Sequence, residues 1–409
     1  MTAARLLGAA GLTFGLMLGG VGPAVADEAD VVGGAALGRA GVVVDLPAGV
    51  PPPPALPVAS YLLADLDTGE VLAARSAHAR RLPASTLKVL TALVLLPRLA
   101  PTTTVLATDT DVAVDGTKVG MLPGSRYAVQ LLFQAMLMAS GNDAAYALAR
   151  AGGGLPGTVA AMNAEAAELG AFDTVARDPS GLDAPGQSSS AYDLALIGRA
   201  AMQRNDFRGY VAMRQARFPG GRRPDGSVAK PFMIGNHNRL LYNYPGTIGV
   251  KNGYTVQALQ TYIGAVRRGG RTLLLASMGG TTPSWRPPAA MFDWAFRYAA
   301  RVRPVGTLVE PGTVTRPPAT PAGTAAPAAA ATPTASASAP PLSAAAAPLR
   351  GPGLAPRAAQ RPPTGFLRLS VDDAVRPWLG AGAAVVVLLL AAALLTALAG
   401  LPGVRRRAD

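Results

Sequence analysis

The sequence contains no cysteine and only two histidines, His78 and His237. No disulfide can form, and none is needed, because an exported domain of ordinary size can be stable on its core alone. A zinc site would require carboxylate ligands to complete it, which argues against a metallopeptidase. Neither histidine has a nucleophile-elbow serine near it, which argues against a Ser-His-Asp triad. We therefore expect no metal and no other cofactor.

Aromatic residues and lysines are also scarce. Aromatic residues make up 5% of the chain, and its basic residues are scattered, so nothing indicates nucleic-acid binding. Between residues 58 and 302 there are 25 basic and 16 acidic residues, which fits either an anionic envelope polymer as partner or simply an arginine-rich composition. The lysines are Lys88, Lys118, Lys230 and Lys251. Because lysine can lose its proton while arginine keeps it, these few lysines are candidates for chemistry.

The two ends of the chain carry long apolar runs. Residues 1–26 have the pattern of a signal peptide, with small residues at Ala24-Val25-Ala26 before the expected cleavage. Residues 378–401 are almost wholly apolar and long enough to cross about 30 Å of hydrocarbon as a helix. The arginines of the tail, 402–409, predict that the C-terminus is cytoplasmic. We expect an exported protein anchored in the cell membrane by a C-terminal transmembrane helix.

Proline-rich segments separate these runs from the rest of the chain. Residues 27–57 form a predicted Pro-rich lead segment. Residues 303–377 form a predicted disordered tether, because their Pro- and Ala-rich composition cannot bury enough apolar surface to fold. One domain remains at 58–302, and the topology places it on the cell-wall side of the membrane.

Within this domain, strand-like runs lie at both ends and helical runs lie between them. Strands are expected at 60–66, 71–75, 248–251, 260–266 and 272–278. Helices are expected at 85–96, 131–138, 162–169, 191–202 and 289–301. This order predicts an α/β (α+β) fold, in which a mostly antiparallel sheet is flanked by helices and an inserted helical lobe.

Ser85 and Lys88 stand one turn apart at the start of a predicted helix, so their side-chain heads can approach each other. A serine hydroxyl is a poor nucleophile until a base takes its proton, and lysine can be that base only when neutral. Ser85 could instead only cap the helix. A second copy of the spacing, Ser227 to Lys230, lies among glycines and a proline, where no helix is expected, and Lys118 also lacks the expected context.

Two further motifs follow in order. Ser140-Gly141-Asn142 falls in a loop between predicted helices, where Asn142 could also cap the next helix. Lys251-Asn252-Gly253 falls in a strand-like run. Burial and the neighbouring Lys251 cation would both disfavour protonation of Lys88. Together, helix start, loop and strand predict a serine acyl-transfer site in the cleft between the sheet and the lobe.

At these motifs the chain resembles the low-molecular-mass penicillin-binding proteins, which are serine D-alanyl-D-alanine carboxypeptidases. The resembling segments are 78–88, 137–145, 178–182, 189–193 and 250–255. The resemblance covers 58–302 and implies a β-lactamase/DD-peptidase-like fold. It implies an exported enzyme that removes the terminal D-alanine from peptidoglycan stem peptides through an acyl-enzyme. β-Lactams, which mimic the terminal dipeptide, would act as covalent inhibitors.

The resemblance also implies roles for individual residues. Ser85 would be the nucleophile and Lys88 its base. Ser140 would relay a proton toward the leaving amine. Asn142 would hold Lys88 and the substrate backbone, and Lys251 would keep positive charge in the cleft.

The third motif departs from the family pattern. Asn252 stands where the family usually has a threonine, whose hydroxyl would contact the terminal carboxylate of the substrate. An amide can also donate hydrogen bonds, so recognition is expected to survive with altered geometry. Gly253 is expected to leave the strand edge open for a substrate that pairs as an added strand. The backbone N–H groups of Ser85 and Tyr254 would form the oxyanion hole.

Two other functions stay open. A β-lactamase shares the Ser-x-x-Lys motif, but class A members use a Glu-x-x-x-Asn arrangement, and Glu165 and Glu168 lie in an alanine-rich run without that asparagine. The second is a catalytically slow, membrane-anchored scaffold that binds peptidoglycan. This alternative stays open because of Asn252 in the third motif. The sequence favours the carboxypeptidase.

Overall fold

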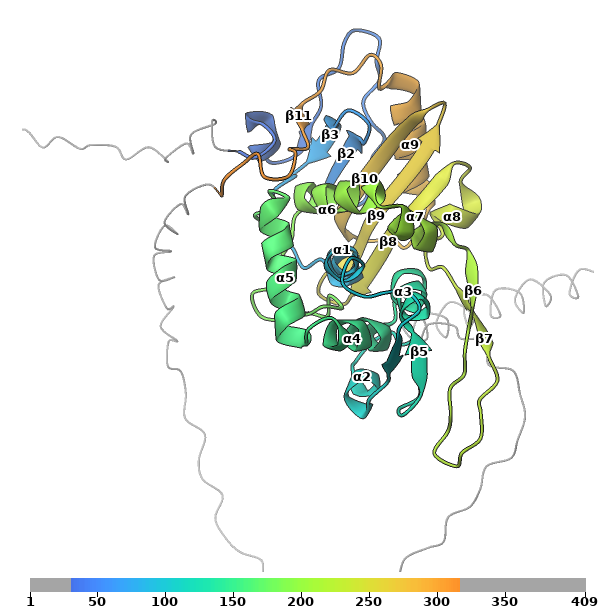
Figure 1. The fold of residues 1–409 in the computed structure, drawn as a ribbon. Coiled ribbons are helices and arrows are strands. Elements are labelled where there is room, and N and C mark those ends of the chain that lie inside the picture. The colour runs from blue at the N-terminus through green and yellow to red at the C-terminus, as the bar shows by residue number, and fades with distance from the viewer. Residues whose placement is uncertain (1–30, 317–409) are drawn as a thin grey trace, which may run out of the picture. The chain divides into compact units, whose positions relative to one another are not determined.

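The computed structural model describes residues 31–316 (Figure 1). The predicted signal peptide 1–26, membrane helix 378–401 and tail 402–409 lie outside the described residues, as does most of the tether. Within residues 31–316, no helix is both long enough and apolar enough to cross a membrane.

A seven-stranded antiparallel sheet forms the scaffold. Its strands are β1 (Val42–Val43), β2 (Ser60–Asp65), β3 (Glu70–Arg75), β8 (Thr247–Thr255), β9 (Leu259–Arg268), β10 (Arg271–Gly280) and β11 (Gly306–Thr307). They lie in the order β1-β3-β2-β10-β9-β8, with β11 also on β3. The prediction of an antiparallel sheet built from both ends of the domain is confirmed, since β2 pairs with β10.

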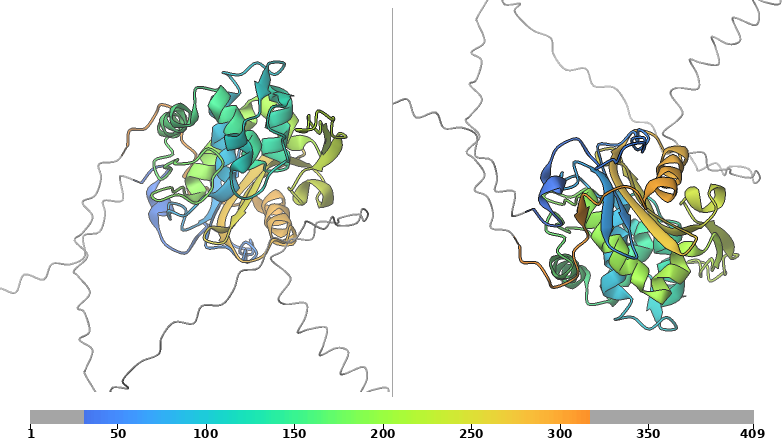
Figure 2. Two further views of the ribbon diagram at one scale, coloured as in Figure 1. Left: turned by 90° about the horizontal axis from the view of Figure 1, so that it is seen from below. Right: turned by 90° about the horizontal axis from the view of Figure 1, so that it is seen from above.

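The helices lie mainly in the inserted lobe. They are α1 (Lys88–Leu95), α2 (Asp109–Ala113), α3 (Val129–Met138), α4 (Asn142–Ala151), α5 (Leu155–Glu168), α6 (Ala191–Gln203), α7 (Asn205–Ala212), α8 (Leu240–Asn243) and α9 (Arg286–Tyr298), with short 3-10 turns η2 (Ala35–Gly38) and η3 (Ala84–Leu87). Two small hairpins, β4–β5 (Thr104–Leu106, Arg126–Ala128) and β6–β7 (Gln215–Phe218, Phe232–Gly235), complete the fold. Figure 2 shows α9 on one side of the sheet and the lobe on the other.

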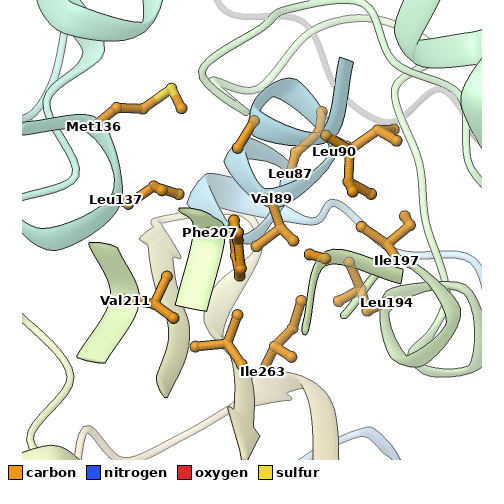
Figure 3. Packing of buried hydrophobic residues seen from close by; sticks show 14 of the residues in the cluster. Leu87, Val89, Leu90, Met136, Leu137, Leu194, Ile197, Phe207, Val211 and Ile263 are labelled. Atoms are coloured by element: carbon orange, nitrogen blue, oxygen red, sulfur yellow. The ribbon is translucent and has the colours of Figure 1, made fainter. Parts of the chain in front are cut away.

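Alternating residues of the central strands feed two cores. Leu274 and Ala276 of β10 face the lobe, whereas Leu273 and Leu275 face the side covered by α9. On the lobe side, residues of η3, α1, α3, α6 and α7 converge on β9, as Figure 3 shows. Such two-sided burial explains why these strands have almost continuous apolar sequences. It also fixes η3, which carries Ser85, against β8 and β9.

The segment 27–57 was predicted to lie apart from the domain, but in the structure its residues from 31 on pack against it. β1 pairs with β3, and Val50 and Leu56 are buried beside α9. The Trp294 indole donates to the Pro51 carbonyl at 2.8 Å. At the other end, the Thr307 N–H donates to the Gly33 carbonyl at 2.9 Å. A proline-rich segment can make such contacts because its backbone keeps its carbonyl acceptors. The folded body therefore extends beyond 58–302 on both sides.

Candidate active site

Ser85 lies in the turn η3, and Lys88 is the first residue of α1, so the predicted one-turn spacing is present. Every residue of α1 is buried, because apart from Lys88 and Thr91 the helix is apolar on all sides. Lys88 Nζ lies 2.9 Å from Ser85 Oγ. Neither η3 nor α1 has a side-chain cap, so Ser85 does not serve as one.

Lys88 is fully buried and has three polar neighbours. Besides Ser85, its Nζ lies 2.7 Å from Asn142 Oδ1 and 2.6 Å from the Ser180 carbonyl oxygen. Burial lowers the pKa of Lys88 well below its usual value, and the nearby Lys251 lowers it further. A neutral amine has two N–H groups and one lone pair. Because Asn142 Oδ1 and the Ser180 carbonyl can only accept, they take the two N–H groups and leave the lone pair to Ser85.

Ser140 occupies the turn between α3 and α4. Its φ of 60° lies in the left-handed region, and the Gly141 N–H donates to the Ala135 carbonyl at 3.0 Å, which closes the end of α3. Serine at this position, where glycine is usual, carries backbone strain of the kind that concentrates at functional sites. Asn142 begins α4 without capping it; its amide nitrogen donates to the Asp115 carbonyl at 2.6 Å, which turns Oδ1 toward Lys88.

Lys251 reaches across the cleft from β8. Its Nζ donates to Ser140 Oγ at 3.0 Å and to the Asn252 carbonyl at 2.7 Å. The side chain is buried, and this burial lowers its pKa to about 7. The cation expected in the cleft is therefore only about half present at neutral pH.

The residues after Lys251 alternate along the strand. Asn252 and Tyr254 are partly or largely exposed, whereas Gly253 is buried. A Cβ at Gly253 would lie 2.5 Å from Thr261 Oγ1 and 2.7 Å from the backbone nitrogen of Ser85. Gly253 thus makes room for the protein's own η3 turn, and its expected role toward substrate stays a prediction. In the described part of the chain β8 pairs only with β9, so its other edge has no strand partner, as pairing with an added strand would require.

Asp178 is a site residue that sequence reasoning left without a role. Its Oδ1 accepts the Ser180 N–H at 2.7 Å and the Ser180 hydroxyl at 2.5 Å, and its Oδ2 accepts the Tyr146 hydroxyl at 2.5 Å. Gly181, with φ of 81°, brings this turn so close to η3 that a Cβ would lie 2.0 Å from the Ala84 carbonyl oxygen. The segment 178–182 resembles the family in sequence, but its contact with Lys88 is made by a backbone carbonyl, which no residue type signals.

Asp143 is a second such residue. It is fully buried, and its carboxylate accepts the N–H groups of Val119, Gly120 and Met121 at 2.9–3.2 Å. These contacts fasten the loop whose Asp115 carbonyl orients Asn142. Its place directly after the Ser-Gly-Asn motif is the only sequence signal for it.

The other candidates lie outside this site. Ser227 and Lys230 are exposed in the connection between β6 and β7, and Lys118 donates to the Val112 carbonyl at the surface. His237 lies by the end of α3, where its N–H donates to the Met138 carbonyl at 2.9 Å.

The His78 ring faces protein groups on both sides. It lies 2.8 Å from Asp173 and 3.0 Å from the Val32 carbonyl. Among residues 31–316, His78, Asp173 and Asp193 are the one group whose donor atoms lie close enough together to hold a metal. Because both ring nitrogens are engaged within the protein, this cluster offers no free imidazole ligand.

Comparison with known proteins adds a family to this geometry. A sequence model described as Peptidase S11, D-alanyl-D-alanine carboxypeptidase, matches residues 49–282. The D-alanyl-D-alanine carboxypeptidase DacB2 of Mycobacterium tuberculosis is 45% identical over 257 residues, which cover 61% of this chain and 86% of DacB2. DacA of Escherichia coli, also a D-alanyl-D-alanine carboxypeptidase, is 32% identical over 273 residues, covering 63% of this chain and 65% of DacA.

Solved structures show the same fold. A crystal structure of a D-alanyl-D-alanine carboxypeptidase from M. tuberculosis H37Rv matches with a TM-score of 0.59 and 44% identity, covering 64% of this chain and 99% of that chain. The Streptomyces K15 DD-transpeptidase matches with a TM-score of 0.57 and 26% identity, covering 60% of this chain and all of that one. The predicted DD-peptidase-like arrangement of antiparallel sheet and helices is confirmed.

Proposed function

The chain belongs to the S11 family of serine D-alanyl-D-alanine carboxypeptidases, and on that basis we propose how its residues divide the work. The family's activity is the removal of the terminal D-alanine from peptidoglycan peptides outside the cytoplasm, and its members bind penicillin. The observation that carries the assignment of roles is the placement of Lys88 Nζ, 2.9 Å from Ser85 Oγ, with two acceptors on its other sides.

Acylation begins at Ser85. Neutral Lys88 takes the hydroxyl proton, and Ser85 Oγ forms a bond to the carbonyl carbon of the penultimate D-alanine. The electron pair of that carbonyl moves to its oxygen, giving a tetrahedral oxyanion. The backbone N–H groups of Ser85 and Tyr254 stabilise this oxyanion. Support for this pair comes from the close packing of β8 on η3 at Gly253.

The leaving group departs on the side of Ser140. The C–N bond breaks as the amine nitrogen receives a proton from the Ser140 hydroxyl, which is replenished from Lys251, 3.0 Å away. D-Alanine leaves and an ester on Ser85 remains. Before deacylation the proton that Lys88 took returns through solvent to Lys251, which restores neutral Lys88 and the Lys251 cation. A water molecule then gives a proton to Lys88 and attacks the ester, and Lys88 passes that proton back to Ser85 as the shortened peptide departs.

Substrate binding uses the open edge of β8. The peptide pairs along that edge as an added strand, which places its terminal carboxylate near Asn252 and Lys251. The Asn252 amide donates to the carboxylate in place of the hydroxyl that is usual in the family. A β-lactam enters the same way and acylates Ser85.

For localisation, we propose that the chain is exported and held in the membrane by a helix at 378–401. Support comes from the signal-like pattern of residues 1–26, the apolar length of 378–401 and the arginines that follow it. The folded body would then work on the cell-wall side, on a proline-rich tether.

Two measurements on the purified full-length chain test this function. A fluorescent penicillin should form a stable adduct on Ser85, located by peptide mass spectrometry, and a peptide ending in D-Ala-D-Ala should release D-alanine. Labelling without release would favour the slow scaffold, which the Asn252 substitution keeps as second candidate. Rapid turnover of the label would favour a β-lactamase. Absence of labelling would contradict both the mechanism and the residue roles.

A further inference from the structure

The turn 178–182 is built around the carboxylate of Asp178. This side chain is only 8% exposed, and it accepts hydrogen bonds from Ser180, Leu182 and Tyr146. Helix α1 also holds the turn, because the Thr91 hydroxyl donates to the Pro179 carbonyl at 2.6 Å. A buried carboxylate with this many donors holds the groups around it in one arrangement.

This arrangement fixes the position of the Ser180 carbonyl group. The Ser180 carbonyl oxygen lies 2.6 Å from Lys88 Nζ, and it is one of the two acceptors that leave the lone pair of the amine facing Ser85. If the turn shifted, Lys88 could direct an N–H toward Ser85 and would lose its action as a base. The other acceptor, Asn142 Oδ1, is held separately through the Asp115 carbonyl.

We propose that Asp178, braced by Tyr146, is a positioning residue for acylation: it fixes the Ser180 carbonyl that orients Lys88 toward Ser85. This inference rests on the proposed roles of Ser85 and Lys88. Neither Asp178 nor Tyr146 touches the reacting atoms. Both act through the turn, from a loop and from α4 respectively.

Asp178 also acts on Lys88 through its charge. The groups that bear on the protonation of Lys88 are Lys251 on β8, which disfavours it, and Asp178 and Asp143, which favour it. Removing the Asp178 charge should therefore let Lys88 lose its proton at lower pH. A positional effect lowers the rate at every pH, while a charge effect moves the acidic midpoint, so the two can be separated.

The experiment measures the second-order rate of acylation by a fluorescent penicillin from pH 4 to pH 9, in the full-length chain. Asp178→Asn keeps the shape of the side chain but removes its charge. We expect the plateau rate to fall about tenfold and the acidic midpoint to move down by about one pH unit. Tyr146→Phe keeps the charge but removes the brace, so the plateau should fall severalfold without a downward shift of the midpoint.

Asp65→Asn is the matched control. Asp65 is a buried carboxylate that organises the β2–β3 turn, where it accepts the Asp67 N–H at 2.9 Å and pairs with Arg271. This variant should lose stability but keep both the plateau and the midpoint. Thermal melts report whether each variant is folded.

The outcomes separate cleanly. A wild-type plateau in folded Asp178→Asn, or the same loss of plateau rate in Asp65→Asn, overturns the inference. If Asp178→Asn does not fold, Tyr146→Phe decides alone, and a wild-type plateau in it overturns the inference. If the wild-type chain itself is not acylated at Ser85, the proposed function fails instead.

Discussion

Lys251 of the sheet and Ser140 of the helical lobe meet in the cleft, with Nζ 3.0 Å from Oγ and both side chains buried. The contact joins residues 111 positions apart in the chain. The catalytic cluster therefore exists only when the sheet and the lobe are docked, and each of its two lysines works in an environment that neither part could provide alone. Different substitutions should reveal their different tasks.

Lys88→Arg should abolish acylation while leaving the fold intact. Arginine stays protonated and therefore cannot act as a base, so the penicillin acylation rate should fall about 10²–10⁴-fold. Lys230→Arg, in the exposed second Ser-x-x-Lys sequence, is the control and should label normally. Near-normal labelling of a folded Lys88→Arg chain would mean that another group removes the Ser85 proton.

The charge of Lys251 should limit the enzyme at alkaline pH. Its pKa of about 7 means that the cation is lost as the pH rises through neutrality. We expect kcat/KM for a D-Ala-D-Ala peptide to decline above about pH 7 in the wild-type chain. In Lys251→Arg the rate should be lower at every pH, because arginine cannot pass a proton to Ser140, but it should not decline above pH 7, because arginine remains charged. Lys118→Arg should keep the decline. A wild-type profile that is flat to pH 10 would refute this assignment.

The same burial predicts a dependence of stability on pH. The pKa of Lys251 is about 7 in the folded state and about 10.4 in an unfolded chain, so the unfolded state binds more protons between these values. Stability conferred by this site is thus complete above about pH 10.4 and is lost as the pH falls through 7. Lys251→Met should raise the free energy of unfolding by a few kcal/mol at pH 6, and little at pH 10.5. Equilibrium denaturation at both pH values measures this.

Asn252 should contact the substrate carboxylate. If its amide donates there, Asn252→Ala should reduce kcat/KM for D-Ala-D-Ala peptides about tenfold, and Asn252→Asp should reduce it further, because a carboxylate of similar size repels the substrate. Lys251 donates a hydrogen bond to the backbone carbonyl of Asn252, so the position of the Lys251 side chain should survive both substitutions. Equal activity of the two variants would show that residue 252 does not face the carboxylate.

Gly181→Ala should damage the site from a distance. A Cβ there would lie 2.0 Å from the Ala84 carbonyl oxygen, next to Ser85. Gly226→Ala is a matched control, since Gly226 has nearly the same φ, 83° against 81°, but open space around it. The control should lose about 1 kcal/mol with normal acylation, whereas Gly181→Ala should lose more and acylate poorly. Comparable behaviour of both variants would remove the case for close packing at 181.

Much of this fold could be predicted because its signals are local. The hairpin at 60–75 and the strands after 247 have alternating or continuous apolar sequences, and Ser85 and Lys88 meet because one helical turn brings them together. The motif order then placed Asn142 and Lys251 near them. The alternative cap roles of Ser85 and Asn142 are not seen, because tertiary partners hold both side chains.

The remainder depends on groups that have no residue-type signature. The Ser180 carbonyl contacts Lys88 as backbone, so only the turn built by Asp178 could have pointed to it. Position 253 requires a glycine because the η3 turn packs against it, and strand periodicity alone does not reveal this neighbour. The proline-rich residues up to 57 pack because Trp294 and the core beside α9 accept them, and such partners are distant in the sequence.

The hydrogen bond between Thr307 and Gly33 lies beside β3, whereas β8 forms the opposite edge of the sheet. Both flanks of the folded body thus join it on the side farthest from the edge where a peptide would pair. A fluorescent protein, an affinity handle or a solid support fused through either flank should leave enzymatic turnover intact. Immobilised wall-trimming reactors and surface-display assays could therefore use either end of this body as the point of attachment.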